Sequence, residues 1–456
     1  MVFSSLTFLF AFLPITLILY YLVPKKAKNV VILVSGLLFY AWGEPKYMLL
    51  MLVSIVQGYG FGLLIEKHRG QKASKVFLTL SILVSLGLLG YFKYADFFLS
   101  SVNAVTGLSL PLLKLSLPIG ISFYTFQTMS YTIDVYRGEA KAQKNIINFG
   151  AYVTLFPQLI AGPIVRYQTV ADELEHRDCA ADLFADGVKR FACGIGKKVL
   201  LANNIGLLWE AASVQAAPTV LTAWLGVIAY SLQLYFDFSG YSMMGIGMGK
   251  MLGFDFPQNF NYPYISASIT EFWRRWHMTL SGWFREYVYI PLGGNRKGLR
   301  RQIFNLFVVE LLTGIWHGAN WNFICWGLYY FVLLALEKLF LLPYLKKGRV
   351  WPHLYTLFLV VVGWAMFVGN DAGVEFGLLF QKLFIPSGGV MPLYFLRNYG
   401  VLLAVSVLCC TPLIEKLWDR LSRHAVTKAL TILALLTISM AYVVGSTNSP
   451  FLYFNF

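Results

Sequence analysis

The sequence predicts an all-α, polytopic integral membrane protein. Of its 456 residues, 57% are hydrophobic and only 13% are charged, a balance that soluble globular domains do not show. Aromatic residues make up 17% of the chain, and Trp and Tyr gather where membrane helices meet the two interfaces. Apolar runs alternate with short basic loops. We therefore expect about eleven spanning helices of the usual ~20 residues, together with shorter interfacial or re-entrant helices.

The first third of the chain contains five apolar runs that we expect to be helices of the membrane. They are residues 3–23, 30–42, 47–65, 76–94 and 112–135, the last of which is interrupted by Pro-Ile-Gly at residues 118–120. Basic loops follow the first, third and fifth runs, so these loops share one side of the membrane. By the positive-inside rule that side is the cytosol, which puts the N-terminus outside. No basic residue precedes Lys25, so we interpret the first run as a retained spanning helix rather than a cleaved signal peptide.

The middle of the chain is less regular. Run 146–164 contains two prolines, and loop 166–186 is the most acidic part of the chain. Segment 188–209 has four basic residues, so we expect a tilted or re-entrant helix that other helices shield. Run 219–236 is predicted to span the membrane. It leads into five glycines that we interpret as sites of close helix–helix contact: Gly240, Gly245, Gly247, Gly249 and Gly253.

Further apolar runs occupy residues 321–342, 355–368, 401–410 and 427–444, whereas run 377–385 is too short to span a bilayer. The chain shows neither a soluble domain nor a long linker. We predict a single membrane-embedded domain over residues 1–456, with a catalytic core at about residues 219–342.

The formal net charge of +15 has a topological explanation. Most basic residues lie in short loops between apolar runs, and no nucleic-acid-binding motif accompanies them, so we expect no nucleic acid partner. The five cysteines lack CxxC spacing, and three of them lie in apolar runs. We interpret them as buried free thiols rather than as disulfides or a metal site.

The stretch from Thr270 to Asn320 combines charge with histidine. Between Glu271 and Arg301 it has seven basic and two acidic residues. We predict a helix over residues 271–287 that lies along the cytosolic interface, with His277 on its apolar, inward face. The alternative is an interfacial histidine that only hydrogen-bonds a neighbour.

A second histidine, His317, ends a predicted span. Residues 302–316 contain one charge, Glu310, and a helix of fifteen residues rises about 22 Å through a ~30 Å hydrocarbon core. An ionisable residue at that depth is costly and indicates a functional site. A buried neutral imidazole is a natural general base for a hydroxyl that attacks an acyl thioester. The alternative is a histidine that only caps the end of a helix.

Two histidines suit acid–base or positioning roles better than metal binding, because no third histidine or carboxylate stands at ligand spacing. We therefore predict no metal. Asp237 ends an apolar run, so it is expected to be either paired or functional. The remaining histidines are predicted to lie at the solvated surface: His68, His176, His353 and His424.

Nine stretches of the chain resemble the membrane-bound O-acyltransferase family, and in particular the bacterial branch that includes the membrane subunit of alginate O-acetylation. They extend over nearly the whole chain. They are residues 39–42 (FYAW), 118–124 (PIGISFY), 156–164 (FPQLIAGPI), 236–242 (FDFSGYS), 259–264 (NFNYPY), 269–277 (ITEFWRRWH), 283–296 (WFREYVYIPLGGNR), 314–321 (GIWHGANW) and 450–454 (PFLYF).

The resemblance implies an acyltransferase with a tunnel through the membrane. His317 corresponds to the family's invariant histidine and His277 to its second polar active-site position. Other residues of the matching motifs are expected to contact substrate: Asp237, Trp273, Arg274, Arg275, Trp316 and Asn320. The basic cluster could also attract the donor's phosphates, with topology signalling as the alternative.

In this branch the expected donor is cytosolic acetyl-CoA, which is a co-substrate rather than a bound cofactor. The acetyl group would pass His317 and reach an extracytoplasmic acetyltransferase that modifies a polysaccharide. The expected partners are therefore the lipid bilayer, that acetyltransferase, and an acyl-CoA or acyl carrier. The expected location is the bacterial cytoplasmic (inner) membrane.

Two alternative functions stay open on the sequence. D-alanyl transfer to teichoic acid from a carrier protein would use the same pair of histidines. A transporter or flippase without chemistry is the non-enzymatic alternative, although the chain shows no internal repeat of the kind that many transporters have.

Overall fold

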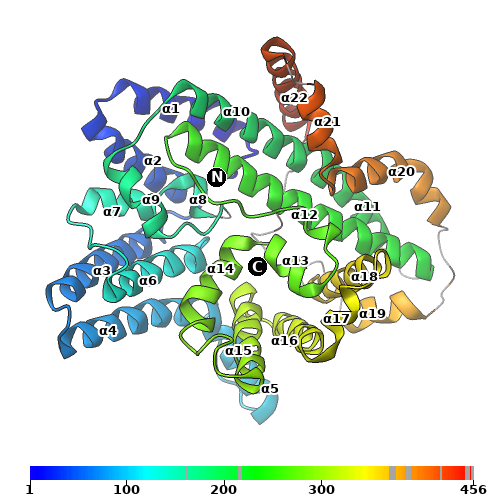
Figure 1. Cartoon of the computed structure of the whole chain (residues 1–456), viewed down its shortest axis with the longest axis horizontal. Coiled ribbons are helices and arrows are strands. Elements are labelled where there is room, and N and C mark those ends of the chain that lie inside the picture. Colours follow the sequence, from blue (N-terminus) through cyan, green and yellow to red (C-terminus); the bar gives the residue numbers. More distant parts are fainter. Residues whose placement is uncertain are drawn as a thin grey trace. The chain divides into compact units, whose positions relative to one another are not determined.

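The computed structural model describes residues 1–160, 162–213, 218–368, 376–385, 388, 392–421, 424–446 and 452. Over these residues the regular structure is entirely helical (Figure 1), which confirms the all-α fold class. Six of the described helices are long and apolar enough to cross a membrane: Met48–Lys67, Lys72–Thr106, Val220–Met251, Trp321–Leu345, Pro392–Cys409 and Ala425–Gly445. Shorter apolar helices occupy Phe8–Leu22 and Trp351–Phe367. The count of about eleven spans stays a prediction.

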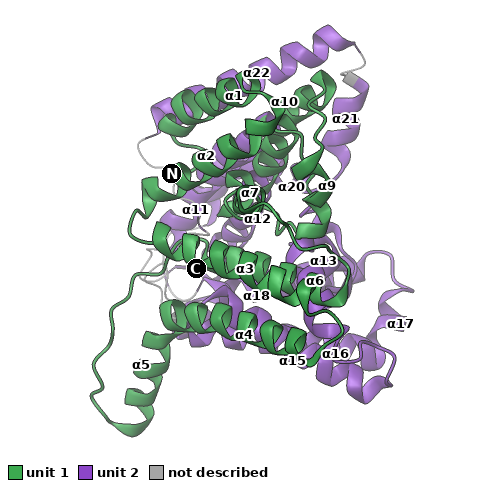
Figure 2. Ribbon diagram, turned by 90° about the vertical axis from the view of Figure 1, so that its left-hand side faces the viewer, with its two compact units in different colours: residues 1–191, 242–257 green, residues 192–241, 258–456 purple. Residues whose placement is uncertain are grey.

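The helices divide between two compact units (Figure 2). Unit 1 comprises Met1–Phe191 and Ser242–Pro257, and unit 2 comprises Ala192–Tyr241 and Gln258–Phe456. The boundary falls within the 32-residue helix α12 (Val220–Met251). All the predicted site residues therefore belong to unit 2.

In unit 1, α3 packs against both α4 and α6, and α2 packs against α7. The elements of this part are η1 (Phe8–Phe12), α1 (Leu13–Leu22), η2 (Lys25–Ala27), α2 (Lys28–Gly43), α3 (Met48–Lys67), α4 (Lys72–Leu89), η3 (Gly90–Tyr94), α5 (Ala95–Thr106), α6 (Ile121–Arg137), α7 (Ile146–Val153), α8 (Phe156–Leu159), α9 (Tyr167–Glu175) and α10 (Ala181–Gly196), which crosses into unit 2.

In unit 2, α15 and α16 form a helical hairpin, and α16 also packs against α13 and α18. The elements are η4 (Lys197–Ala202), α11 (Asn203–Ser213), η5 (Pro263–Ile265), α13 (Ile269–Arg275), α14 (Met278–Phe284), η6 (Arg285–Tyr289), α15 (Leu299–His317), α16 (Trp321–Leu336), η7 (Glu337–Leu341), α17 (Leu342–Leu345), α18 (Trp351–Phe367), α19 (Phe376–Phe384), α20 (Pro392–Cys409), α21 (Leu413–Leu421) and α22 (Ala425–Gly445).

Three glycines of α12, Gly240, Gly245 and Gly247, lie where another backbone comes close, as the sequence predicts. Within unit 2, a Cβ added to Gly240 would lie 2.7 Å from the carbonyl oxygen of Gly194. Within unit 1, a Cβ on Gly247 would lie 2.6 Å from the carbonyl oxygen of Gly187. Any larger side chain would push α10 away from α12, so these glycines allow the two helices to touch.

The fifth predicted run, residues 112–135, is interrupted at residues 118–120, as the sequence predicts. Helix α6 starts at Ile121, directly after this interruption. Pro118 has no backbone N–H to donate, and Gly120 adopts a positive φ of 74°, which breaks the helical path before α6. Hydropathy reports where a chain is apolar, whereas these two residues decide where the helix begins.

Aromatic side chains fill the space between α13, α16 and α18. The ring centroids of Trp276 and Trp364 are 4.7 Å apart, and those of Trp326 and Tyr330 are 5.0 Å apart. Trp326, Tyr330 and Trp364 are at most 1% exposed. Rings of this size have few alternative packings once they are enclosed, so this core holds the three helices in one arrangement.

Candidate active site

His317 is the last residue of α15, where the sequence predicts the end of a helix. Two glycines bring α15 against α16 just before this point. A Cβ on Gly314 would collide with the carbonyl oxygen of Phe323, and a Cβ on Gly327 with that of Glu310. Because both residues are glycines, the two backbones pack in contact, and the end of α15 is held against the start of α16.

The imidazole of His317 lies in an aromatic enclosure. Its ring centroid is 5.0 Å from those of Trp316 and Trp326 and 5.2 Å from that of Phe367, and all three contacts are edge-on. Only 5% of the residue is exposed. Rings on three sides of the imidazole limit the access of water to it, as a site that handles a reactive acyl group requires.

The prediction of one continuous helix over residues 271–287 is wrong. Helix α13 ends at Arg275, and α14 begins at Met278. Between them His277 adopts the left-handed conformation, with φ 43° and ψ 53°. A non-glycine residue with positive φ is uncommon, although histidine tolerates it better than most. Such strain, of about 1–3 kcal/mol, persists where surrounding contacts hold it, and it concentrates at functional sites.

Asn259 supplies the contacts that hold this break. Its backbone carbonyl accepts a hydrogen bond from the N–H of Met278 at 2.9 Å. Its side-chain oxygen accepts from the hydroxyl of Thr279 at 2.9 Å and lies 3.0 Å from Nδ1 of His277. The sequence breaks the helix here because Asn259 offers tertiary hydrogen bonds in place of the helical ones.

These contacts also define the protonation state of His277. The Oδ1 atom of Asn259 is an acceptor, so Nδ1 of His277 carries the hydrogen and donates it, which leaves Nε2 as the basic nitrogen. Burial lowers the pKa of His277 to about 3, and the residue has no exposed surface. His277 is therefore neutral at physiological pH, and Nε2 has no hydrogen-bond partner among the described residues.

Trp316 connects the two histidines. Its ring centroid lies 6.0 Å from that of His277 and 5.0 Å from that of His317. Phe238 covers another side of His277, with centroids 4.8 Å apart. The structure thus brings together three of the predicted site residues: His277, between α13 and α14, and Trp316 and His317, at the end of α15.

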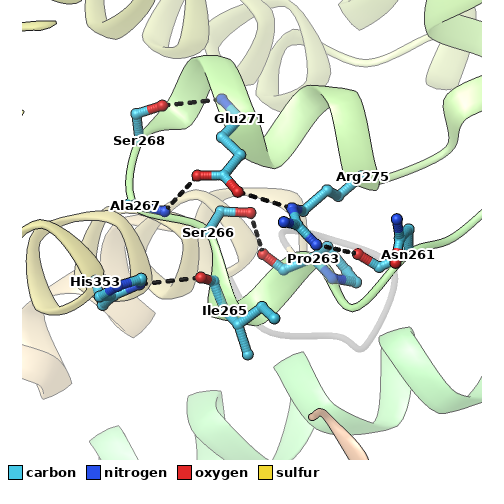
Figure 3. Close-up of polar contacts among 9 residues, drawn as sticks. All are labelled: Asn261, Pro263, Ile265, Ser266, Ala267, Ser268, Glu271, Arg275 and His353. Atoms are coloured by element: carbon cyan, nitrogen blue, oxygen red, sulfur yellow. Dashed lines mark hydrogen bonds and ion pairs between the residues drawn. The ribbon is translucent and has the colours of Figure 1, made fainter. Parts of the chain in front are cut away.

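Helix α13 is anchored by the polar contacts in Figure 3. Ser268 accepts a hydrogen bond from the N–H of Glu271 at 3.0 Å, and the Glu271 carboxylate accepts from the N–H of Ala267 at 3.0 Å. This exchange resembles a capping box. The other Glu271 oxygen accepts from Nε of Arg275 at 2.9 Å, and Nη1 of Arg275 donates to the carbonyl of Asn261 at 3.1 Å. These contacts fix both ends of the short helix.

The two predicted arginines have different surroundings. Arg275 is partly buried and bound to Glu271 and Asn261, so it stabilises the loop that precedes α13. Arg274 is exposed and remains available to an anion. Trp273 points toward α16, where its ring centroid lies 5.6 Å from that of Trp326 and 5.1 Å from that of Tyr330.

Asp237 is paired, which is one of the two alternatives that the sequence left open. Its carboxylate lies 2.7 Å from Nζ of Lys198, and both side chains are 2% exposed. The second oxygen accepts a hydrogen bond from the N–H of Leu452 at 2.8 Å. Of motif 450–454, only Leu452 lies within the described residues. Two charges buried together at good geometry stabilise each other, and either one alone would be costly.

Asn320 has a structural contact: its side-chain oxygen caps α16 by accepting from the N–H of Asn322. Among the other histidines, His176, His353 and His424 are exposed and His68 is partly exposed. His353 additionally lies 3.0 Å from the carbonyl of Ile265 (Figure 3). No group of three or more His, Cys, Asp or Glu that could hold a metal occurs among the described residues.

Three residues of the site were not predicted individually. Asn259 belongs to the matching motif 259–264, which marks this segment as part of the family pattern. Its contact with His277 joins residues 18 positions apart, and local sequence patterns do not reveal such a contact. Trp326 and Phe367 contact His317 from α16 and α18. Both lie in apolar runs, where the sequence does not distinguish an aromatic residue that contacts the site from one that only fills the core.

Known proteins resemble this chain over much of its length. The model of the membrane-bound O-acyltransferase family matches residues 137–372. A protein named "Probable alginate O-acetylase AlgI" from Azotobacter vinelandii is 46% identical over 82% of this chain and 76% of its own length. The peptidoglycan O-acetyltransferase of Helicobacter pylori is 31% identical over 100% of this chain and 98% of its own. The teichoic acid D-alanyltransferase of Bacillus subtilis is 31% identical over 49% of this chain and 59% of its own.

The family match covers the break at His277 and the end of α15, and it extends to α18. These comparisons give no support to a transporter without chemistry. Six long apolar helices and the family match together make the chain a multi-pass membrane protein. The protein therefore belongs to the membrane-bound O-acyltransferase family and is an acyltransferase.

Proposed function

We propose that this protein takes an acetyl group from cytosolic acetyl-CoA and moves it through a tunnel in the membrane for O-acetylation of an extracytoplasmic polysaccharide. A partner acetyltransferase on the outer side would complete the transfer. The names of two relatives, an alginate O-acetylase and a peptidoglycan O-acetyltransferase, support O-acetyl transfer. Both relatives resemble this chain over most of its length.

The observation that carries the proposal is the pair of buried histidines on either side of Trp316. Neither imidazole is more than 5% exposed, so water has little access to a reactive thioester there. A base for the acceptor hydroxyl and a second polar group are what acyl transfer to oxygen requires. In the proposal the two imidazoles supply these groups, since both contact Trp316.

In the proposed step, the acceptor hydroxyl oxygen attacks the carbonyl carbon of the thioester, and His317 takes the hydroxyl proton. The carbon–sulfur bond breaks as the new carbon–oxygen bond forms. The departing thiolate takes this proton from the His317 imidazolium and leaves as a thiol. His277 is neutral and points its hydrogen at Asn259, so its Nε2 can accept a hydrogen bond that orients the acceptor.

We further propose a location in the bacterial cytoplasmic membrane with the N-terminus outside. This orientation follows from the basic loops after the first, third and fifth apolar runs. A single functional domain with its core at about residues 219–342 is consistent with the positions of His277 and His317, and α18 adds Phe367 to the enclosure.

The test compares O-acetyl groups released from cell polysaccharides by wild type, His317→Ala and His277→Ala at matched membrane expression. Loss of a general base lowers the rate by about 10²–10⁴-fold, so we expect His317→Ala to abolish detectable O-acetylation. Tyr344→Phe, at an exposed tyrosine of α17, is a matched control that should acetylate normally. Unchanged O-acetylation in His317→Ala would remove His317 from the proposed step.

D-alanyl transfer to teichoic acid from a carrier protein is the second candidate. It is favoured by the 31% identity to a teichoic acid D-alanyltransferase over 49% of this chain. Purified protein in vesicles would be given either acetyl-CoA or a D-alanyl carrier protein, and release of the free thiol would be followed. Turnover of the carrier protein alone would replace the first candidate by the second.

A further inference from the structure

Glu337 is a buried carboxylate that binds the first turn of α13. It is fully buried and is the first residue of η7, directly after α16. One oxygen accepts from the N–H of Ile269 at 2.6 Å. The other accepts from the N–H of Thr270 at 2.9 Å and from the Thr270 hydroxyl at 2.6 Å. Both oxygens of the side chain therefore act as acceptors.

Helix α13 depends on such contacts because it has only seven residues. Helices this short are unstable in isolation, because the free energy lost in nucleating a helix exceeds the free energy gained from a few hydrogen bonds. Its first three N–H groups all bind side chains: Ile269 and Thr270 bind Glu337, and Glu271 binds Ser268 at 3.0 Å. Acceptor oxygens at this end also suit the partial positive charge of a helix N-terminus. Glu337 therefore anchors the start of α13.

The far end of α13 leads directly into the strained backbone of His277. The left-handed conformation there must be held from both sides. Asn259 holds the His277 side chain and the start of α14, whereas α13 determines where the chain enters the break. A shift of the first turn of α13 would consequently be passed on to His277, two residues after the helix ends.

Helix α16 connects this anchor to the other histidine. Trp326 near its start contacts the ring of His317, with centroids 5.0 Å apart, and also packs on Trp273 of α13 at 5.6 Å. Glu337 follows the last residue of the same helix. One continuous element thus touches His317 at one end and anchors α13 at the other.

We propose that Glu337 is a positioning residue of the acyltransferase site, which fixes His277 relative to His317 by anchoring α13 to the end of α16. The kinetic part of this inference rests on the proposed function. Glu337 does not touch the reacting groups in this role, so its loss should affect the turnover of bound substrates more than their binding.

The first experiment measures kcat and KM for acetyl-CoA in vesicles, per folded molecule, for Glu337→Gln. The amide NH2 cannot accept from a backbone N–H, so one N–H of α13 loses its partner. Small displacements of reacting groups cost up to about 100-fold in rate, and we expect kcat to fall about 10- to 100-fold with KM within about twofold. Thr270→Val removes only the hydroxyl contact, and kcat should fall about fivefold.

Asp96→Asn is the matched control. Asp96 belongs to unit 1, and its carboxylate also accepts two backbone N–H groups, from Leu113 at 2.6 Å and Leu115 at 3.2 Å. Its kcat should equal that of wild type. If Glu337 acts on stability alone, Glu337→Gln and Thr270→Val should lower the yield of folded protein and leave kcat per folded molecule unchanged. That result would overturn the proposal.

A double-mutant cycle tests whether Glu337 acts through His277. If it does, adding Glu337→Gln to His277→Ala should lower kcat by less than about twofold, because the group being positioned is already absent. Full additivity of the two losses would overturn the proposal.

Hydrogen exchange provides a readout that needs no substrate. Peptides covering residues 269–281 should exchange at least about tenfold faster in Glu337→Gln than in wild type or Asp96→Asn, since their first-turn hydrogen bonds open more often. Unchanged exchange would overturn the anchoring role. If wild type turns over no thioester, the proposed function fails, and the exchange measurement still decides the role of Glu337.

Discussion

The Nδ1 atom of His277 lies 3.0 Å from Oδ1 of Asn259, and this contact determines which nitrogen of the histidine is basic. The same oxygen accepts from Thr279, so the amide is held in the orientation that makes it an acceptor. Nε2 is left as the nitrogen with a lone pair. A residue 18 positions earlier in the chain therefore sets the chemistry of the candidate active site.

Asn259→Ala should lower kcat by about 10- to 100-fold, which is less than the 10²–10⁴-fold that a general base contributes. The imidazole would remain, but its tautomer and orientation would no longer be fixed. Acetyl-CoA turnover in vesicles measures the effect. Asn261→Ala is the control, because only the backbone of Asn261 takes part in the hydrogen bonds with Arg275. Equal rates in the two variants would show that Asn259 does not orient His277.

Acid should destabilise the protein through His277. Its pKa is lowered by burial from 6.5 to about 3, so below pH 6.5 the unfolded chain binds a proton that the folded protein does not. The contribution to the free energy of unfolding should fall between pH 6.5 and 3, by about 1.4 kcal/mol for each pH unit. His277→Asn removes the titrating ring and tolerates the left-handed backbone.

The measurement is the thermal midpoint of both proteins in detergent across this range. The wild-type midpoint should decline more steeply with acid than that of His277→Asn, and the two should converge in slope above pH 6.5. Parallel curves over the whole range would mean that His277 takes up a proton as readily in the folded protein as in the unfolded chain.

Gly314→Ala should displace the end of α15. The new methyl group would collide with the carbonyl oxygen of Phe323, and overpacking of this kind costs about 1–3 kcal/mol. Because His317 is three residues further on, kcat should fall as well as the thermal midpoint. Gly282→Ala in α14 is the control, since no atom lies within 4 Å of its added Cβ. A Gly314→Ala variant that matches this control would contradict the close packing of α15 and α16.

Asp237→Asn should act on folding rather than on substrate binding. It leaves Lys198 buried without its carboxylate partner, and breaking a buried ion pair in this way costs about 3–5 kcal/mol. The amount of protein in the membrane and its thermal midpoint should both fall. Adding Lys198→Met should restore much of this loss. A rise in KM for acetyl-CoA with normal stability would instead support the predicted contact of Asp237 with substrate.

Arg274→Ala tests the predicted attraction of the donor's phosphates. Arg274 is exposed, so its loss should raise KM for acetyl-CoA and leave the thermal midpoint unchanged. Arg275→Ala breaks the contacts with Glu271 and Asn261 and should mainly lower the midpoint. The KM effect of Arg274→Ala should weaken at high salt, because exposed charges are screened. A KM that responds to neither the substitution nor salt would contradict the phosphate role.

The helical membrane class and the end of a helix at His317 could be predicted because they depend on local properties. Apolar runs and the basic loops between them are features of neighbouring residues, and so is the charge-poor segment before His317. The same local reasoning was wrong for residues 271–287. Their helical periodicity is genuine, but Asn259 accepts hydrogen bonds from residues that follow α13, and these contacts hold His277 in a left-handed conformation.

By itself the sequence determined the polytopic helical architecture and the family resemblance, and it singled out the two histidines as candidates for the chemistry. Only the tertiary structure decided the contacts around them: that Trp316 lies between them, that Asn259 selects the tautomer of His277, that Asp237 is paired with Lys198, and that Glu337 binds the first turn of α13. The physical reason is range. Hydropathy and periodicity act over a few helical turns, whereas a buried hydrogen bond joins whichever residues the fold brings within about 3 Å.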